Sequence, residues 1–159
     1  MFDDAARREV IARFDEMFER RHPTTTSASV ALVERICSAT RAENRAAAEQ
    51  LVAIGELFRY RLSRCSETEE WAIDTEEAVT AEVAAALRIS QALAGSRLRY
   101  ARAMRERLPQ VAEVFKAGDI GLRLFQTIVF RTDLITDPQV LAAVDAQLAV
   151  TVPRWPSLT

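Results

Sequence analysis

Apolar positions along the chain recur three and four residues apart, which is the spacing of helices rather than strands. A first run, Ala6, Val10, Phe14 and Met17, predicts a helix from about residue 3 to residue 21. The stretch 22–26, His-Pro-Thr-Thr-Thr, then breaks the pattern and predicts a linker. A second and much longer run predicts one continuous helix over about 27–65. Its seam consists of Val30, Val33, Cys37, Thr40, Asn44, Ala47, Leu51, Ile54, Phe58 and Leu62.

This seam has two interpretations. It is either the spine of a single-chain bundle or the contact surface of a homodimer. In a dimer, the polar Asn44 would fix the register between the two helices. Gly55 lies inside the predicted helix, where glycine costs roughly 1 kcal/mol, so we expect a neighbouring helix to approach closely there.

Shorter elements follow the long helix. Residues 66–73 read as a polar connection from which Trp71 packs into the core. Asp74 then resembles an N-cap with Glu77 as its capping-box partner, which predicts a helix over 75–87. Ser90 is a second N-cap and opens a helix to residue 108, where Pro109 stops it.

The last third of the chain is also helical in pattern. A short helix from Pro109 should end at Gly118. Residues 122–135 carry apolar side chains on nearly all sides, which predicts a central, buried helix. Asp137-Pro138 is an N-cap with proline at N1, and it starts a helix to about residue 150.

Together these elements predict an all-α, single-domain bundle of six to seven helices over 1–159. Residues 1–26 form its amino-terminal helix and linker, and residues 27–150 its core. Residues 151–159 are expected to be a truncated tail of a longer protein, because they resemble the lead-in to another helix.

Composition supports this fold class and narrows the compartment. Four glycines and five prolines leave little room for a sandwich or a barrel. The net charge of −2 argues against a purely electrostatic polyanion binder. No apolar run approaches the ~20 residues that cross a bilayer, and two cysteines are too few for a disulfide framework. A cytoplasmic protein without membrane contact is expected.

Catalytic chemistry is not indicated. The one histidine, His22, stands beside a proline, so neither a Ser-His-Asp triad nor a Cys-His pair is expected. Cys37 and Cys65 are too far apart in sequence to build a zinc site. We therefore expect no catalytic residues, metal ligands, cofactor or small-molecule substrate, and the chain is not expected to be an enzyme.

Residues 80–99 match the spacing of a helix-turn-helix unit. Ala84 takes the small-residue position of the first helix, Ile89-Ser90 the turn, and Ala94 and Leu98 the packing positions of the second helix. The predicted pair spans about 75–108. Arg88 departs from the pattern, which usually has glycine in the turn.

The second helix of this unit is basic, with five arginines against one glutamate between residues 90 and 108. On a helical wheel Arg99 and Arg102 face away from the apolar stripe and could reach the phosphates of duplex DNA. Gln91 and Ser96 are placed to meet base edges. The alternative is a bundle whose arginines are simply solvated. Arg97 falls within the apolar stripe, so we expect it to be partly buried and paired with a carboxylate of another helix.

A family resemblance follows from the central block. It lies in Ala81-Glu-Val-Ala-Ala-Ala-Leu-Arg-Ile-Ser-Gln-Ala-Leu-Ala, then Tyr100-Ala-Arg-Ala-Met-Arg-Glu-Arg-Leu-Pro109, then Phe115-Lys-Ala-Gly-Asp-Ile-Gly121. These stretches resemble the bacterial 13E12 repeat family, which carries the helical domain of unknown function 222, and the resemblance extends over about 41–159. It implies a helical module associated with mobile elements and with a carboxy-terminal HNH endonuclease domain. An HNH site needs several histidines, so the resemblance does not imply nuclease activity for this chain.

Overall fold

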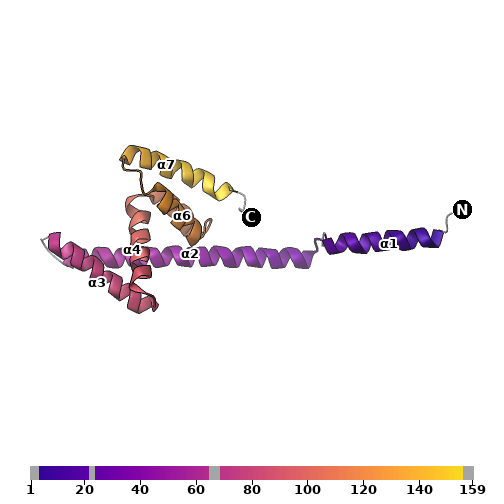
Figure 1. The fold of residues 1–159 in the computed structure, drawn as a ribbon, viewed down its shortest axis with the longest axis horizontal. Coiled ribbons are helices and arrows are strands. Elements are labelled where there is room, and N and C mark those ends of the chain that lie inside the picture. Colours follow the sequence, from indigo (N-terminus) through magenta and orange to yellow (C-terminus); the bar gives the residue numbers. More distant parts are fainter. Residues whose placement is uncertain (1–3, 22–23, 65–68, 156–159) are drawn as a thin grey trace. The chain divides into compact units, whose positions relative to one another are not determined.

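The computed structural model describes residues 4–21, 24–64 and 69–155, with side-chain surroundings for 8–17, 24–64 and 75–155. Its described part contains seven α-helices, a short 3-10 helix and no strand, so the predicted all-α fold is confirmed (Figure 1). The elements are α1 (Asp4–Arg21), α2 (Ser27–Arg64), α3 (Glu69–Leu87), α4 (Gln91–Glu106), α5 (Pro109–Ala117), α6 (Leu122–Thr132), α7 (Pro138–Thr151) and η1 (Val152–Arg154).

The chain divides into two compact units, Met1–Ser38 and Ala39–Thr159, which we call unit 1 and unit 2. Unit 1 contains α1 and the first turns of α2. Unit 2 contains the rest of α2 and all later helices. No helix in the described part of the chain is long and apolar enough to cross a membrane.

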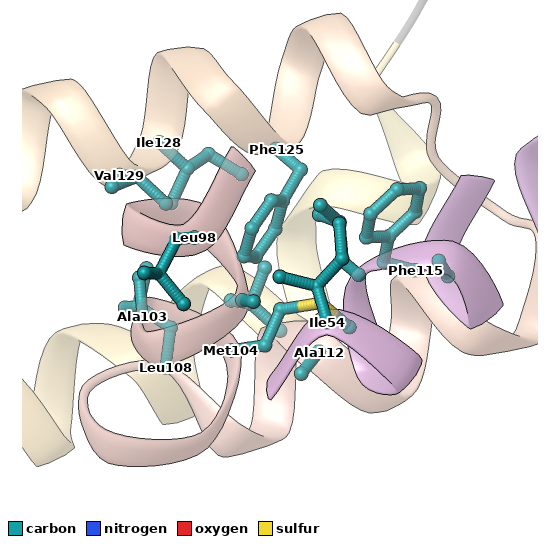
Figure 2. Close-up of a cluster of buried hydrophobic side chains, with 14 of the residues drawn as sticks. Ile54, Leu98, Ala103, Met104, Leu108, Ala112, Phe115, Phe125, Ile128 and Val129 are labelled. Atoms are coloured by element: carbon teal, nitrogen blue, oxygen red, sulfur yellow. The ribbon is translucent and has the colours of Figure 1, made fainter. Parts of the chain in front are cut away.

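The core lies in unit 2 and is built mainly from α2, α4, α5 and α6 (Figure 2). Phe115 and Phe125 stack with ring centroids 5.1 Å apart, and both are fully buried. Helix α4 contacts α3, α5 and α6, while α5 also packs against α7. The second half of the predicted seam joins this core, because Leu51, Ile54 and Phe58 are buried.

The first half of the seam is open, since Val30 and Val33 are exposed. Asn44, in contrast, has a partner within the chain: its side-chain amide donates a 3.1 Å hydrogen bond to the carbonyl of Gly118 in the α5–α6 turn. The carboxylate of Asp119 in the same turn accepts a hydrogen bond from Arg41. The structure therefore gives Asn44 a role in tying α2 to this turn rather than in setting a dimer register.

The expected connection over 66–73 is too long. Helix α3 already begins at Glu69, so Asp74 lies inside the helix and does not cap it. Residues 69–74 contain no glycine or proline to break a helix, and two adjacent glutamates in the first turn complement the helix dipole. Trp71 falls within α3, but its side chain lies outside the described residues, as does His22.

The expectation of an all-round buried helix over 122–135 is also wrong. Helix α6 ends at Thr132, and its buried residues, Phe125, Ile128, Val129 and Thr132, form a single face. Phe130 is 70% exposed and Leu134 is 92% exposed. A helix packed on one side against α4 and α5 leaves its other side to solvent, whatever residues stand there.

The other predicted helix ends are confirmed, except that α4 ends at Glu106 and not at residue 108. Gly118 adopts φ 85°, the left-handed conformation that ends α5. Asp137 caps α7 by accepting backbone hydrogen bonds from Gln139 and Val140 at 2.8 and 3.3 Å. Pro138 occupies the first turn of that helix, as predicted.

Candidate nucleic-acid interface

The turn between α3 and α4 is a tight bend. The backbone N–H of Ile89 donates to the carbonyl of Ala84 at 3.0 Å, and Arg88 donates to Ala85 at 3.3 Å. Arg88 adopts φ 54°, the conformation that glycine usually supplies at such a turn. Ser90 then caps α4, with its hydroxyl oxygen accepting from the N–H of Leu93 at 3.3 Å. The bend predicted at 89–90 therefore forms despite the arginine.

The packing positions of the helix-turn-helix pattern are buried. Ala84 is 9% exposed, Ala94 is fully buried and Leu98 is 1% exposed. Val79 and Val83 of α3 join them in the core. These residues fix the rotation of α4 about its axis, so the opposite face of α4 is the one turned outward.

The outward face carries some of the predicted contact residues. Gln91 is exposed at the first turn of α4, and Arg99 is exposed two turns later. The Arg99 guanidinium lies 5.4 Å from the ring centroid of Tyr100. Ser96 is half-buried, and its hydroxyl donates to the carbonyl of Ala92 at 3.1 Å, so it is less available than expected. The amide of Gln91 and the guanidinium of Arg99 are the accessible groups.

Arg102 was expected on this free face, and the structure places it differently. Its guanidinium lies 3.4 Å from the carboxylates of both Glu76 and Glu106. It also lies over the Phe58 ring at 5.5 Å, and its Nε is buried. An arginine between two carboxylates adds no net positive charge to the surface, because its field is already neutralised. The helical wheel could not show that α3 brings Glu76 to this arginine, nor that its side chain lies over Phe58 of α2.

A groove of about 530 Å³ runs beside α4 and contains Ser96 and Arg99. Arg102 and Arg107 line it too, but so do three acidic residues, Glu76, Glu106 and Asp133. Arg107 is committed elsewhere, since it donates to backbone carbonyls at the end of α6. The groove is therefore balanced in charge and does not suit a polyanion along its length. The exposed arginines of the unit that make no ion pair with the described residues are Arg88 in the turn and Arg99 and Arg105 in α4.

Arg97 is half-buried, as the wheel indicated, but its partner is not a carboxylate. Its Nη1 donates a 2.9 Å hydrogen bond to the amide oxygen of Gln50 in α2. Its Nε has no hydrogen-bond partner. A neutral acceptor serves because the guanidinium remains partly solvated and does not need full charge compensation.

Sequence reasoning missed Arg88 as a candidate contact. It is exposed, lies just before the amino-terminal end of α4, and makes no side-chain ion pair with the described residues. The sequence did show an arginine at the turn position that usually has glycine. This departure was interpreted only as a feature that disfavours a tight turn, not as an exposed positive charge.

The fold and this site define an all-α protein with a helix-turn-helix-like unit at its centre. Residues 38–159 match the family model described as domain of unknown function (DUF222). The chain belongs to this family. The matched segment begins one residue before unit 2 and covers all of it.

Relatives occur in Mycobacterium tuberculosis. Uncharacterized protein Rv2100 of strain H37Rv is 41% identical over 147 residues, which cover 90% of this chain and 26% of the relative. Uncharacterized protein Rv3776 of the same strain is 39% identical over 129 residues, covering 81% of this chain and 24% of the relative. The chain thus spans about a quarter of the length of these relatives. No solved structure matches it.

Proposed function

We propose that this chain is a non-catalytic helical module that associates weakly with duplex DNA through the α3–turn–α4 unit. The observation that carries the proposal is the left-handed Arg88 turn, which presents the start of α4, with Gln91, to solvent. In helix-turn-helix proteins the corresponding end of the second helix enters the major groove.

Charge distribution limits the mode of binding. Arg88 and Arg99 are exposed and make no ion pair with the described residues, whereas Arg102 is neutralised by two glutamates. Gln91 is the one exposed side chain in the first turn of α4 that pairs well with a base edge, because its amide can form two hydrogen bonds with adenine. Binding should therefore depend mainly on two phosphate contacts and show little sequence preference.

The full-length relatives set the context in which such a module would act. Because the chain spans about a quarter of their length, the proposal concerns this module and not the function of the whole relatives. The resemblance to 13E12 proteins implies an HNH nuclease elsewhere in such proteins. A weak, sequence-tolerant DNA contact would suit a module that holds duplex near another domain, since tethering raises the effective concentration of the second contact.

The test is fluorescence anisotropy of the full chain with a labelled duplex at low salt. Arg88→Ala combined with Arg99→Ala should weaken binding about equally for all duplex sequences. The slope of log K against log salt should fall by roughly two units, because each phosphate contact contributes about 0.9. The matched control combines Arg123→Ala with Arg131→Ala, which removes the same two charges from exposed arginines of α6.

Two results would refute the proposal. One is the absence of binding at protein concentrations of tens of micromolar, near the weak end of non-specific DNA affinity. The other is an equal loss of affinity in the control that combines Arg123→Ala with Arg131→Ala, which would show that net charge alone is responsible.

A further inference from the structure

Within the residues whose side-chain surroundings the structure describes, unit 1 has no core of its own. Among its described side chains, over 8–17 and 24–38, none is buried. Most helix stability in proteins comes from tertiary packing of an apolar face rather than from intrinsic propensity. The described part of unit 1 therefore lacks the burial that usually stabilises helices.

The apolar face exists, but it is open. Eight of the fifteen large exposed hydrophobic residues of the described chain lie in unit 1, which is less than a quarter of the sequence. Their exposed fractions range from 42% at Val30 to 67% at Val10. We call them the unit 1 face: Val10, Ile11, Phe14 and Met17 of α1, and Val30, Leu32, Val33 and Ile36 of α2.

The spacing of this face suits a helical partner. Val10, Phe14 and Met17 follow the alternating four-and-three spacing of a helix–helix seam, with Ile11 beside them. In α2, Val30 and Val33 begin the same seam that chain-internal helices cover further along, at Leu51 and Ile54. The continuation of this seam packs against other helices, whereas its beginning is uncovered. Because both parts have the same spacing, the uncovered part suits contact with another helix.

The charges of α1 favour a second copy of the same helix in antiparallel orientation. Its sequence contains five acidic and five basic residues, so two copies meet no net repulsion. The segment of α1 before Phe14 contains three arginines and two acidic residues, and the segment after it contains three acidic residues and two arginines, so the two segments carry net charges of +1 and −1. Antiparallel pairing about Phe14 sets the basic segment of one copy against the acidic segment of the other, whereas parallel pairing sets like against like.

We propose that the chain forms a homodimer through the unit 1 face, with α1 of one copy antiparallel to α1 of the second. This differs from a dimer along the whole of α2, because the second half of α2 is occupied by the core of unit 2. Pairing of two such faces would give an interface with an apolar centre and a charged rim.

The test is sedimentation equilibrium of the full chain, without DNA, from roughly 1 to 200 µM, the range in which modest interfaces dissociate. The wild-type chain should be dimeric at the upper end. Phe14→Asp and Val33→Asp should each make it monomeric. The matched control is Leu134→Asp, at the most exposed large apolar side chain of unit 2, which should stay dimeric. Thermal unfolding of unit 2 should be unchanged in all three, since none of these residues is in its core.

Charge reversal tests the orientation. Arg13→Glu and Asp15→Arg should each weaken the dimer, and the double variant should regain most of the affinity, because it exchanges the two segments together. A wild-type chain that is monomeric throughout overturns the proposal, whether α1 then binds another protein or folds back on its own chain. A dimer that survives Phe14→Asp, or that Leu134→Asp disrupts, also overturns it. A double reversal no tighter than the single ones overturns the antiparallel arrangement.

Discussion

Asp145 of α7 caps a helix to which it does not belong: its Oδ1 accepts a 2.9 Å hydrogen bond from the backbone N–H of Val111 in α5. Its Oδ2 accepts a second bond, also 2.9 Å, from Gln110. Helix α5 needs this help, because its own N-cap residue is Leu108, which offers no side-chain acceptor. The carboxylate is 1% exposed and sits at the positive end of the helix dipole.

Removal of this cap should be among the most destabilising polar substitutions in unit 2. Asp145→Ala leaves two N–H groups without acceptors and should lower the free energy of unfolding by about 3 kcal/mol. Asp145→Asn keeps one acceptor oxygen and should lose about half as much. Urea denaturation followed by circular dichroism measures both. Asp133→Asn, at an exposed aspartate, is the control and should change stability little. An Asp145→Ala variant as stable as that control would contradict the cap.

Two glycines should respond to alanine in opposite directions. At Gly118, φ is 85° and an added Cβ would lie 2.6 Å from the carbonyl oxygen of Arg41, so Gly118→Ala should cost about 2 kcal/mol or more. At Gly55 an added Cβ would lie 3.7 Å from the Cβ of Ala101, which is ordinary contact. Gly55→Ala should therefore gain roughly 0.5–1 kcal/mol from helix propensity.

Melting temperatures of the two variants and the wild-type chain decide this prediction. A loss of stability at Gly55 would mean that α2 and α4 approach more closely than the structure shows. The close approach expected there from the sequence is real but leaves room for a methyl group.

Two half-buried arginines, Arg97 in α4 and Arg107 directly after it, should differ in how much they contribute to stability. Arg97 makes a single hydrogen bond to Gln50, so Arg97→Met should change stability by less than about 1 kcal/mol in either direction. Arg107 donates to the carbonyls of Thr132 and Ile135 at 2.9 and 3.3 Å, where α6 ends. Arg107→Met should cost about 2 kcal/mol, because those carbonyls lose a charged donor. Chemical denaturation of both variants gives the comparison, and equal losses would count against it.

The sequence predicted the helices well wherever a local signal marks their ends. Ser90, Gly118 and Asp137 end or begin helices through their own side chain or backbone, so the pattern alone located them. Asp74 carries the same kind of signal and failed, because capping is worth only about 1 kcal/mol and the preceding residues continue the helix without it.

Tertiary partners were the part that sequence could not supply. The helical wheel indicated that Arg97 is partly buried, but the amide of Gln50 that meets it comes from α2. The carboxylate of Glu76 that meets Arg102 comes from α3. Phe130 shows the same limit, because an apolar residue becomes core only if another element covers it, and here none of the described helices does. The composition of a helix therefore indicates how much apolar surface could be buried, but not how much of it other elements cover.

Arg88 offers a separation of stability from binding. A non-glycine residue such as Arg88 adopts the left-handed conformation at a cost of roughly 1–2 kcal/mol. Replacement by glycine removes this cost, but glycine also has greater conformational freedom in the unfolded chain, which offsets part of the gain in stability. Arg88→Gly should therefore raise the free energy of unfolding by about 0.5–1 kcal/mol. The same change removes an exposed cation beside the start of α4, so the slope of log K against log salt for duplex DNA should fall by about 0.9. Arg88→Lys keeps both the strain and the charge and should leave stability and salt slope near those of the wild-type chain.

Thermal unfolding and anisotropy titrations at several salt concentrations measure the two effects on the same samples. A glycine variant that is more stable yet binds DNA as the wild type does would remove Arg88 from the interface, and one that is less stable would show that the turn carries no strain.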